Sequence, residues 1–470
     1  MATKGFSRAV STLTKEAGDI SSIFPSLSGK KVLLLAPRYS ELKKQLIQGK
    51  EEAVVKSWHR LQASLQGEIT ELKQKGNKVI GEVDFLDIRN GSVPQSFVDS
   101  IRHRGVGIIR NVLPRTYALD LKAQAKEYIA ANKDKVKAFP KDNPAVFELY
   151  WSPAQVQARA HRNMLRTQSF LTTLWQSSDP NSQISTTYPL TYADRIRIRQ
   201  PGDAKFALGP HTDGGSVERW EDPTYAKVYQ KIFDGEWEKY DPYDARHRMD
   251  ATMDMYNGGG ACSMFRLFQG WLAMSSTGPG EGTLRVCPLL RHASAYMLLR
   301  PFFNLENDEL DLNSTAFPGS VQGAAQELSP QTHPGLDLAH TVLSIPKVEP
   351  GDFVAWHCDT IHAVDAEHKG KSDSSVLYIP AVAMTKGNVE FLRRQRESAS
   401  AFSPPPDFPG AGSEGEKTYR GRMDWSSDTI DAAGKRAMGF RGQLSFEILP
   451  NMSDGEQSVI RESNRVLFDM

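Results

Sequence analysis

The chain has 470 residues, enough for a large hydrophobic core and for two or three domains, or for one elaborated β domain. Charged residues make up 24% of it, hydrophobic residues make up 39%, and the formal net charge is +1. This balance excludes a global field of the kind that gathers nucleic acid or an anionic membrane surface. Three cysteines without CxxC spacing argue against a disulfide framework or a zinc knuckle and indicate a reducing compartment. No apolar run approaches the roughly 20 residues that a membrane span needs, so we expect a soluble, cytoplasmic protein.

Residues 1–95 are expected to form a helical N-terminal extension. Lys4 and Arg8 lie among Ser and Thr near the start, so a mitochondrial presequence stays open. The early Glu16 and the lack of an apolar core favour a frayed polar tail instead. From about residue 40 to residue 75, apolar side chains recur mainly at three- and four-residue steps, which predicts one amphipathic helix that ends at Gly76.

Residues 96–390 carry the patterns of a mixed domain. A β-branched run at 105–110 predicts a strand, and the stretch from 114 to 132, rich in good helix formers, predicts a helix. Further helices are expected near 155–160 and 163–175. Residues 195–199 then alternate strictly between arginine and isoleucine, which predicts a strand with three arginines on one face. That face is either solvated or lines a ligand cavity, and the pattern leaves both readings open.

A His-x-Asp motif, His211-Thr212-Asp213, follows this strand between turn-forming residues. Side chains two residues apart on an extended segment point to the same side, so one imidazole and one carboxylate can meet one metal ion. The motif alone is weak, because His357-Cys358-Asp359 matches it as well. A long irregular segment extends from Asp213 to about residue 260, and its length favours a lid or a substrate segment.

The second half of the domain consists mainly of strand patterns. Strands are expected at 265–274, at 282–288 and at 375–380. Between the last two, a Gly-Asp turn at Gly351 precedes a strand and a short connector that ends in a histidine, His362.

This order of motifs resembles that of the iron(II)/2-oxoglutarate oxygenases, and within them the phytanoyl-CoA-hydroxylase-like branch. The resemblance rests on His211-x-Asp213, the strand with Trp271, Gly282-Thr283-Leu284, Gly351-Asp352, and His362, and it covers roughly residues 190–385. Much of the chain also looks like a bacterial and fungal family known only as a domain of unknown function. The resemblance implies an α+β fold built on a double-stranded β-helix, the jelly-roll or cupin barrel.

The resemblance further implies a facial triad of His211, Asp213 and His362 that binds Fe(II) and leaves open positions for 2-oxoglutarate and oxygen. His357 would be a histidine of the cavity wall. Trp271 would line the cosubstrate site, although a plain buried aromatic is an equally good interpretation. An alternative ligand set, His357 with Asp359 and His362, uses sequence neighbours alone and fits the strand order less well. In halogenating relatives a small residue replaces this carboxylate; because Asp213 is present, the resemblance implies hydroxylation or oxidative removal of a group instead.

The sequence departs from the resembled enzymes at the group that anchors the far carboxylate of 2-oxoglutarate. Those enzymes have an arginine shortly after the second histidine, and Asp373 occupies that position here. A buried anion needs a cation, preferably a guanidinium. The candidates are Lys371, Arg266, Arg197 and Arg199, and the first two are favoured.

Residues 391–470 are expected to form a C-terminal linker and tail, with a charged helix at 388–397, a Pro/Gly-rich linker at 403–413 and a short helix at 454–467. The tail either wraps the main domain or pairs with a second subunit of a homodimer. Taken together, the sequence predicts an enzyme that hydroxylates a small organic substrate and releases succinate and CO₂, with neither nucleic acid nor membrane as partner. Two alternatives stay open: a catalytically silent barrel that binds small acids, and a cupin-like metal enzyme that uses no oxoacid.

Overall fold

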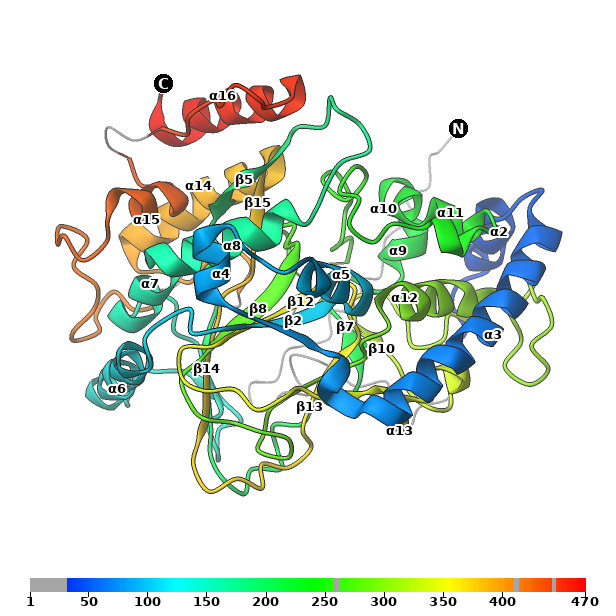
Figure 1. The fold of residues 1–470 in the computed structure, drawn as a ribbon, viewed down its shortest axis with the longest axis horizontal. Coiled ribbons are helices and arrows are strands. Elements are labelled where there is room, and N and C mark those ends of the chain that lie inside the picture. Colours follow the sequence, from blue (N-terminus) through cyan, green and yellow to red (C-terminus); the bar gives the residue numbers. More distant parts are fainter. Residues whose placement is uncertain (1–31, 257, 259–261, 409–413, 442–444) are drawn as a thin grey trace, which may run out of the picture.

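Two β-sheets form the centre of the fold (Figure 1). The computed structural model describes residues 32–470 except 257, 259–261, 409–413 and 442–444. Within these residues the larger sheet has eight strands in the order β1-β2-β12-β8-β14-β6-β4-β3. Its strands are β1 (Gly81–Asp84), β2 (Val106–Arg110), β3 (Ala138–Phe139), β4 (Val146–Phe147), β6 (Ile196–Arg199), β8 (Phe268–Ala273), β12 (Phe353–His357) and β14 (Ser374–Tyr378).

The centre of this sheet is antiparallel and buried on both faces. β8 lies between β12 and β14, where Trp271 is directly opposite Val354 on one side and Tyr378 on the other. Every residue of β8 and β12 is buried, as near-continuous apolar runs require when both faces of a sheet are covered. β1 and β2 pair in parallel at one edge.

A second sheet, five-stranded in the described residues, has the order β10-β7-β13-β9-β11. Its short strands are β7 (His211–Thr212), β9 (Leu284–Val286), β10 (Gln326–Glu327), β11 (Leu343–Ser344) and β13 (His362–Val364). One apolar cluster contains Trp271 and Val376 of the large sheet together with Leu284 and Val286 of the small one. The inner faces of the two sheets therefore pack against each other, and the protein has a mixed α+β fold with several sheets.

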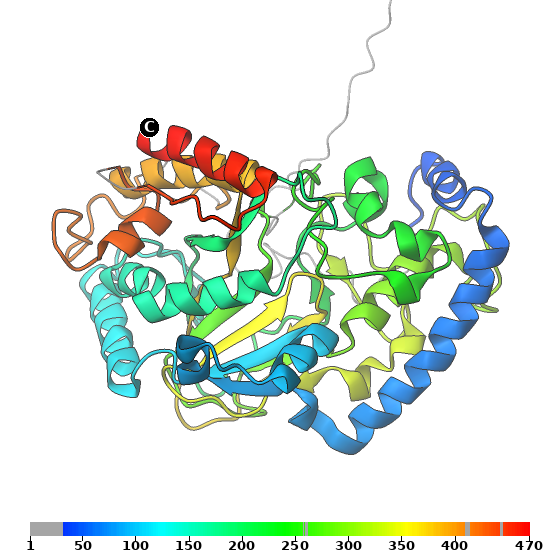
Figure 2. The same cartoon turned by 45° about the horizontal axis from the view of Figure 1, so that its top comes forward.

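Helices cover both ends of these sheets, and Figure 2 shows α3 on one side with α14 and α16 on the other. At the first end lie α2 (Arg38–Leu46), α3 (Glu51–Lys75), α9 (Glu218–Glu221), α10 (Pro223–Val228), α11 (Gln230–Phe233), α12 (Leu290–Leu299) and α13 (Leu338–Thr341). Helix α3 buries an apolar stripe that includes Trp58, Leu61 and Leu65, the side of an amphipathic helix that faces a core. Short 3-10 turns complete this end: η1 (Gly76–Val79), η2 (Trp237–Lys239), η3 (Arg300–Phe302) and η4 (Pro334–Leu336).

At the other end a small sheet of β5 (Ile184–Leu190) and β15 (Val382–Thr385) packs with helices from the middle and the end of the chain. The helices that contact this sheet are α8 (Arg162–Thr173), α14 (Lys386–Ala401), α15 (Ala432–Ala437) and α16 (Asp454–Phe468). Helices α6 (Arg115–Ala131) and α7 (Pro153–Ala160) pack on each other, and α7 also contacts α8 and α15. Helix α4 (Phe85–Asn90) packs on α8 and β1, and α5 (Gln95–Arg104) packs on β1 and β2. The buried Glu416 accepts hydrogen bonds from the backbone N–H groups of Tyr150 and Trp151. The C-terminal segment is thus fastened to its own chain.

The structure corrects one expected helix. The single helix predicted for residues 40–75 is two helices, α2 and α3, with a break at residues 47–50. Gly49 lies in this break at a φ of +72°, a conformation that glycine adopts without steric cost and that ends a helix. The apolar periodicity continues across the break because both helices contribute to one core cluster, and this continuity hides the break from the sequence.

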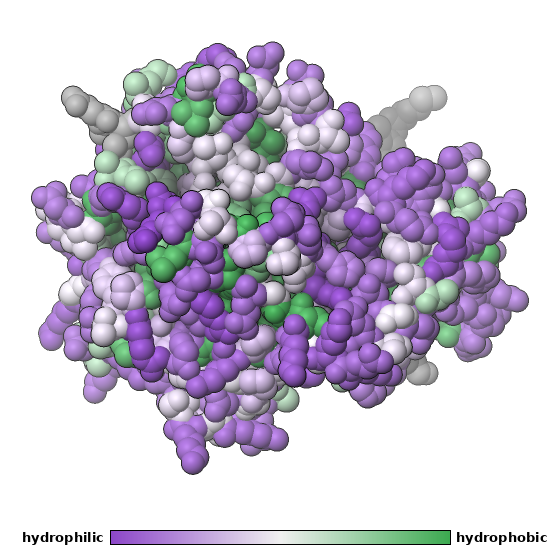
Figure 3. Space-filling model, in the orientation of Figure 1, coloured by the Kyte–Doolittle hydropathy of each residue, from purple (hydrophilic) through white to green (hydrophobic). Residues whose placement is uncertain are grey.

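Hydrophilic side chains cover most of the face shown in Figure 3, with hydrophobic ones in small patches between them. Among the described residues, no helix is both long and apolar enough to cross a bilayer. The basic N-terminal tail, and with it the presequence alternative, lies outside the described residues.

Candidate metal centre

The structure brings His211, Asp213 and His362 together, although the second histidine lies far along the chain. Strand β7 pairs with β13 so that His211 and His362 are directly opposite each other, with ring centroids 4.2 Å apart. Directly paired residues point to the same face of a sheet. One ligand atom from each of the three side chains lies within 4.8 Å of the other two, and His211 Nε2 is 3.6 Å from Asp213 Oδ1.

Both imidazoles are oriented by backbone carbonyls. His211 Nδ1 lies 2.8 Å from the carbonyl oxygen of Gly209, and His362 Nδ1 lies 3.0 Å from that of Thr360. A carbonyl oxygen can only accept, so Nδ1 of each ring carries the proton and Nε2 carries the lone pair. This is the arrangement by which proteins orient histidine ligands of a metal ion.

The charge states of two of these groups suit a metal site. Burial lowers the pKa of His362 to about 4, with a further contribution from the adjacent His211, so this imidazole is neutral at pH 7. Burial alone would raise the pKa of Asp213, but His362, His211, Arg266 and Arg195 outweigh it and hold the pKa below its ordinary value. Asp213 is therefore a carboxylate at neutral pH.

A glycine turn and a buried arginine hold Asp213 in place. Gly214 and Gly215 follow it with φ values of +81° and +89°, and a Cβ atom on Gly215 would lie 2.5 Å from the carbonyl oxygen of Met253. The guanidinium of Arg219, which is fully buried, donates to the carbonyls of Asp213 (2.7 Å) and Gly215 (2.6 Å). Sequence reasoning missed Arg219, and the only signal for it was the Gly-Gly pair after the motif.

The competing group, His357-Cys358-Asp359, also lies within ligand distance, but its atoms already have partners. His357 Nε2 lies 3.0 Å from the carbonyl of Pro242, and His357 Nδ1 accepts from the N–H of Asp359. Asp359 accepts from Arg248 at 2.6 Å and from the hydroxyls of Tyr229 and Tyr240, both at 3.3 Å or closer. Asp359 thus forms a buried ion pair with Arg248, and its carboxylate oxygens already accept hydrogen bonds from protein groups.

The residues expected in the cavity wall are both buried. His357 stacks on Trp175 with ring centroids 4.7 Å apart. It therefore packs within the core, at the end of β12 and shortly before His362 in the chain. Trp271 lies in the apolar cluster between the two sheets, where a neighbouring ring, Trp356, has its centroid 5.4 Å from that of His362.

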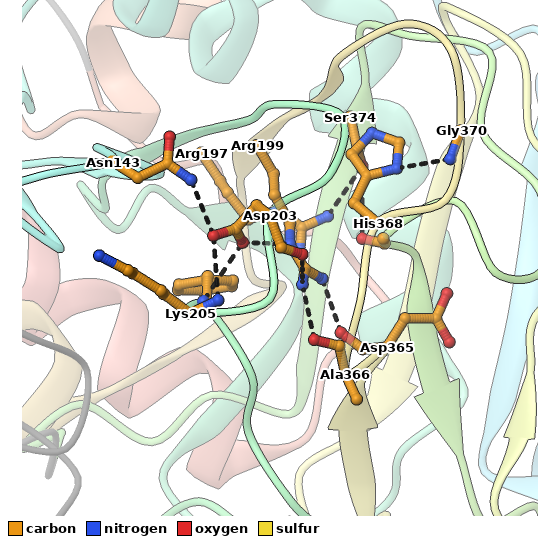
Figure 4. A network of polar contacts seen from close by, with 12 residues as sticks. Asn143, Arg197, Arg199, Asp203, Lys205, Asp365, Ala366, His368, Gly370 and Ser374 are labelled. Atoms are coloured by element: carbon orange, nitrogen blue, oxygen red, sulfur yellow. Dashed lines mark hydrogen bonds and ion pairs between the residues drawn. The ribbon is translucent and has the colours of Figure 1, made fainter.

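Of the four candidate cations, one is exposed and another already has partners for its donors within the protein. Lys371 is exposed on the connection between β13 and β14. Arg199 makes four contacts with three residues: it forms an ion pair with Asp203 at 2.7 Å and donates to the carbonyls of Asp203, Asp365 and Ala366 (Figure 4). It braces the two loops that flank the sheet.

The other two candidates keep donors available. Arg197 is buried, its Nη2 lies 3.4 Å from the hydroxyl of Ser374 (Figure 4), and its Nε has no partner among the described residues. Arg266 approaches Asp213 Oδ2 to 3.8 Å and makes no hydrogen bond within the described part of the chain.

Comparison with known proteins defines the family. The family model described as Gig2-like matches residues 33–440. The crystal structure of GlcNAc Inducible Gene 2 (GIG2, DUF1479) from Candida albicans is 34% identical, with a TM-score of 0.83 over 93% of this chain and 96% of that one. The crystal structure of a hypothetical protein, JW0805, from Escherichia coli is 33% identical, with a TM-score of 0.75 over 87% of this chain and 99% of that one.

Among curated proteins, the uncharacterized protein YbiU of Escherichia coli (strain K12) is 36% identical over 388 residues, which are 80% of this chain and 89% of that protein. The relatives come from a bacterium and a fungus, as the resemblance implied. The chain therefore belongs to the Gig2-like family.

Proposed function

We propose that the protein is an iron(II)/2-oxoglutarate-dependent oxygenase that hydroxylates a small organic substrate. The two facing sheets would be the halves of a double-stranded β-helix, and His211, Asp213 and His362 would hold Fe(II). Two neutral imidazoles and one carboxylate are the ligand set that non-haem Fe(II) oxygenases use, and three protein ligands leave positions open for a chelating oxoacid. Bound iron and 2-oxoglutarate would supply the oxidising chemistry.

The observation that carries the proposal is a set of buried hydrogen-bond donors on the inner face of the large sheet. Arg197 Nε, Gln269 Nε2 and Trp356 Nε1 are buried and have no partner among the described residues. All three are donors, and each costs about 1–3 kcal/mol while it lacks an acceptor. A ligand rich in acceptor oxygens would satisfy them.

The strand register places these donors on one face. Gln269 is directly opposite Trp356, and Trp356 lies beside His362. Arg197 is directly opposite Val376, and Val376 is directly opposite Ala273. Ala273 and Gln269 share a face of β8 because side chains alternate with period two. The three donors thus share the face of the sheet that carries Trp356 beside His362 and the guanidinium of Arg197.

Donors on this face, beside the metal ligands, suit a dicarboxylate whose inner end chelates the metal and whose far end needs a cation. Arg197 would take the far carboxylate, together with Ser374. Ser374 directly follows Asp373, the position where the resembled enzymes have their arginine, and Arg197 reaches its hydroxyl from the neighbouring strand β6. The cation would therefore come from β6 and lie beside Ser374, next to the position where the resembled enzymes have their arginine.

The first test is metal content combined with oxygen consumption. Protein purified without added metal is analysed for metals and then supplied with Fe(II) and 2-oxoglutarate in an oxygen electrode. We expect one Fe(II) per chain and succinate in proportion to the oxygen consumed, with both lost in His211→Ala. The exposed His340, whose ring pairs with Asp337, provides the control His340→Ala.

The alternatives give different results. Binding of 2-oxoglutarate without oxygen consumption would indicate a silent acid-binding barrel. Another resident metal, with no effect of 2-oxoglutarate, would indicate a metal enzyme that uses no oxoacid. Either result refutes the proposal.

A further inference from the structure

The arginines around the triad differ in whether their charge is compensated. Arg248 pairs with Asp359 at 2.6 Å, Arg195 with Asp194 at 3.1 Å, and Arg199 with Asp203 at 2.7 Å. Arg219 binds two backbone carbonyls and has Glu218 as its chain neighbour. Within the described structure, Arg197 has no carboxylate partner, and Arg266 has the carboxylate of Asp213 at 3.8 Å, beyond hydrogen-bond distance.

Arg266 lies on the accessible side of the triad. The side chain of His211 is 4% exposed, whereas those of Asp213 and Arg266 are 18% and 13% exposed. The two oxygens of Asp213 also have different neighbours, because Oδ1 is the one near His211 and Oδ2 is the one near Arg266. Asp213 and Arg266 are therefore more accessible than His211, and the pair is partly open to a ligand.

The guanidinium is arranged to bind a second acceptor. The ring of Tyr192 lies 5.5 Å from its central carbon, and the Tyr192 hydroxyl is used by Asp407. A guanidinium carries five N–H donors in a planar fork, which suits bidentate binding of a carboxylate. At 3.8 Å, Asp213 is beyond hydrogen-bond distance and leaves these donors for a ligand.

The charge balance of a loaded site favours an anion at this place. With a divalent ion bound, Asp213 compensates one of its two charges. The two negative charges of a dicarboxylate cosubstrate compensate the second positive charge of the ion and the charge of Arg197. The charge of Arg266 is then left over in a region shielded from water, where a lone charge is costly. A substrate with one negative charge would compensate it.

We propose that the substrate is a small organic acid with a single negative charge, and that Arg266 binds its carboxylate beside Asp213. This inference rests on the proposed function. The carboxylate would fix one end of the substrate within about two hydrogen-bond lengths of Asp213 Oδ2, roughly 6 Å, and the carbon chain would extend past the metal ligands. The matching amides and alcohols would bind weakly because they leave the guanidinium uncompensated.

The test measures binding and needs no turnover. Protein loaded with Mn(II) and saturated with 2-oxoglutarate is mixed with a panel of monocarboxylic acids of increasing chain length and with their primary amides. Broadening of the small-molecule proton NMR signals by the paramagnetic ion reports binding near the metal. We expect broadening by acids of the panel and little by their amides. Arg266→Gln should weaken the binding of those acids about tenfold to a hundredfold, and Arg266→Lys less.

Arg104 provides the matched control, because it is similarly shielded but is paired with Glu68 and Glu71 between α3 and α5. Arg104→Gln should leave acid binding unchanged even if it lowers the unfolding temperature. Three results overturn the inference: no acid is broadened, amides bind as well as acids, or Arg266→Gln binds the acids as wild type does. If Mn(II) or 2-oxoglutarate fails to bind the wild-type protein, the proposed function fails instead.

Discussion

Arg219 is expected to determine how tightly the protein binds metal, although it is not a ligand. Its guanidinium holds the carbonyls of Asp213 and Gly215, and hydrogen bonds from a charged donor contribute about 1.5–3 kcal/mol each. In Arg219→Gln one amide replaces a two-armed donor, so at least one of these carbonyls loses its partner and the turn after Asp213 loosens. Loss of a group that orients a ligand costs about 10–100-fold in metal affinity.

The assay is a titration with Co(II), followed by the visible absorption of the bound ion, at a temperature where wild type and variants are all folded. Arg300 provides the matched control. It is as buried as Arg219 and also donates to a backbone carbonyl, that of Asn304, but it serves no residue of the triad. Arg300→Gln should lower the unfolding temperature and leave Co(II) affinity unchanged. If Arg219→Gln bound Co(II) within about twofold of wild type, the proposed role of Arg219 would be refuted.

Three further predictions follow from individual contacts. Arg197→Gln should weaken 2-oxoglutarate binding about tenfold to a hundredfold with metal affinity retained, as titration calorimetry would measure. Arg199→Gln should instead cost about 3–5 kcal/mol in unfolding free energy, measured by urea unfolding, because it breaks a buried ion pair. Equal 2-oxoglutarate affinity in wild type and Arg197→Gln would contradict the first expectation. Burial lowers the pKa of His357 to about 3, below the ordinary value of about 6.5. Between these values the unfolded chain binds a proton that the folded chain does not, so the free energy of unfolding should fall as pH falls through this window. Urea unfolding at pH 7 and pH 5 should show a smaller difference in His357→Gln than in wild type, and an equal difference would contradict this expectation. Glu416→Ala should leave the N–H groups of Tyr150 and Trp151 and the Tyr128 hydroxyl without an acceptor, at about 1–3 kcal/mol each; limited proteolysis should then cleave the C-terminal segment faster, and an unchanged cleavage rate would show that this anchor is dispensable.

The strand patterns and the order of the site motifs could be read from the sequence because each depends on local periodicity. The alternation at residues 195–199 is strand β6, and the apolar runs around Trp271 and before His357 are β8 and β12. Local periodicity does not report what covers a face. The arginines of β6 fitted a solvated face equally well, and Arg197 and Arg199 are buried because the five-stranded sheet and the loop with Asp203 cover them.

The partners of the site residues could not be predicted, because they come from distant parts of the chain. The position of Lys371 shortly after His362 favours it as a cation, but the connection between β13 and β14 exposes it. The proposed role of Arg197 in binding the far carboxylate depends on the pairing of β6 with β14, which brings Arg197 beside Ser374. The sequence does not show this pairing. The very short strands β7 and β10 also gave no periodic signal, since two residues cannot show one.

The most direct test of the central claim is the absorption spectrum of the anaerobic Fe(II) protein on addition of 2-oxoglutarate. Chelation of Fe(II) by the oxoacid at a site of two histidines and one carboxylate should produce a visible charge-transfer band. We expect this band to saturate at one 2-oxoglutarate per chain in wild type, to be absent in His211→Ala, and to require much more 2-oxoglutarate in Arg197→Gln. No band in the wild-type protein, or a band of full strength in His211→Ala, would contradict it.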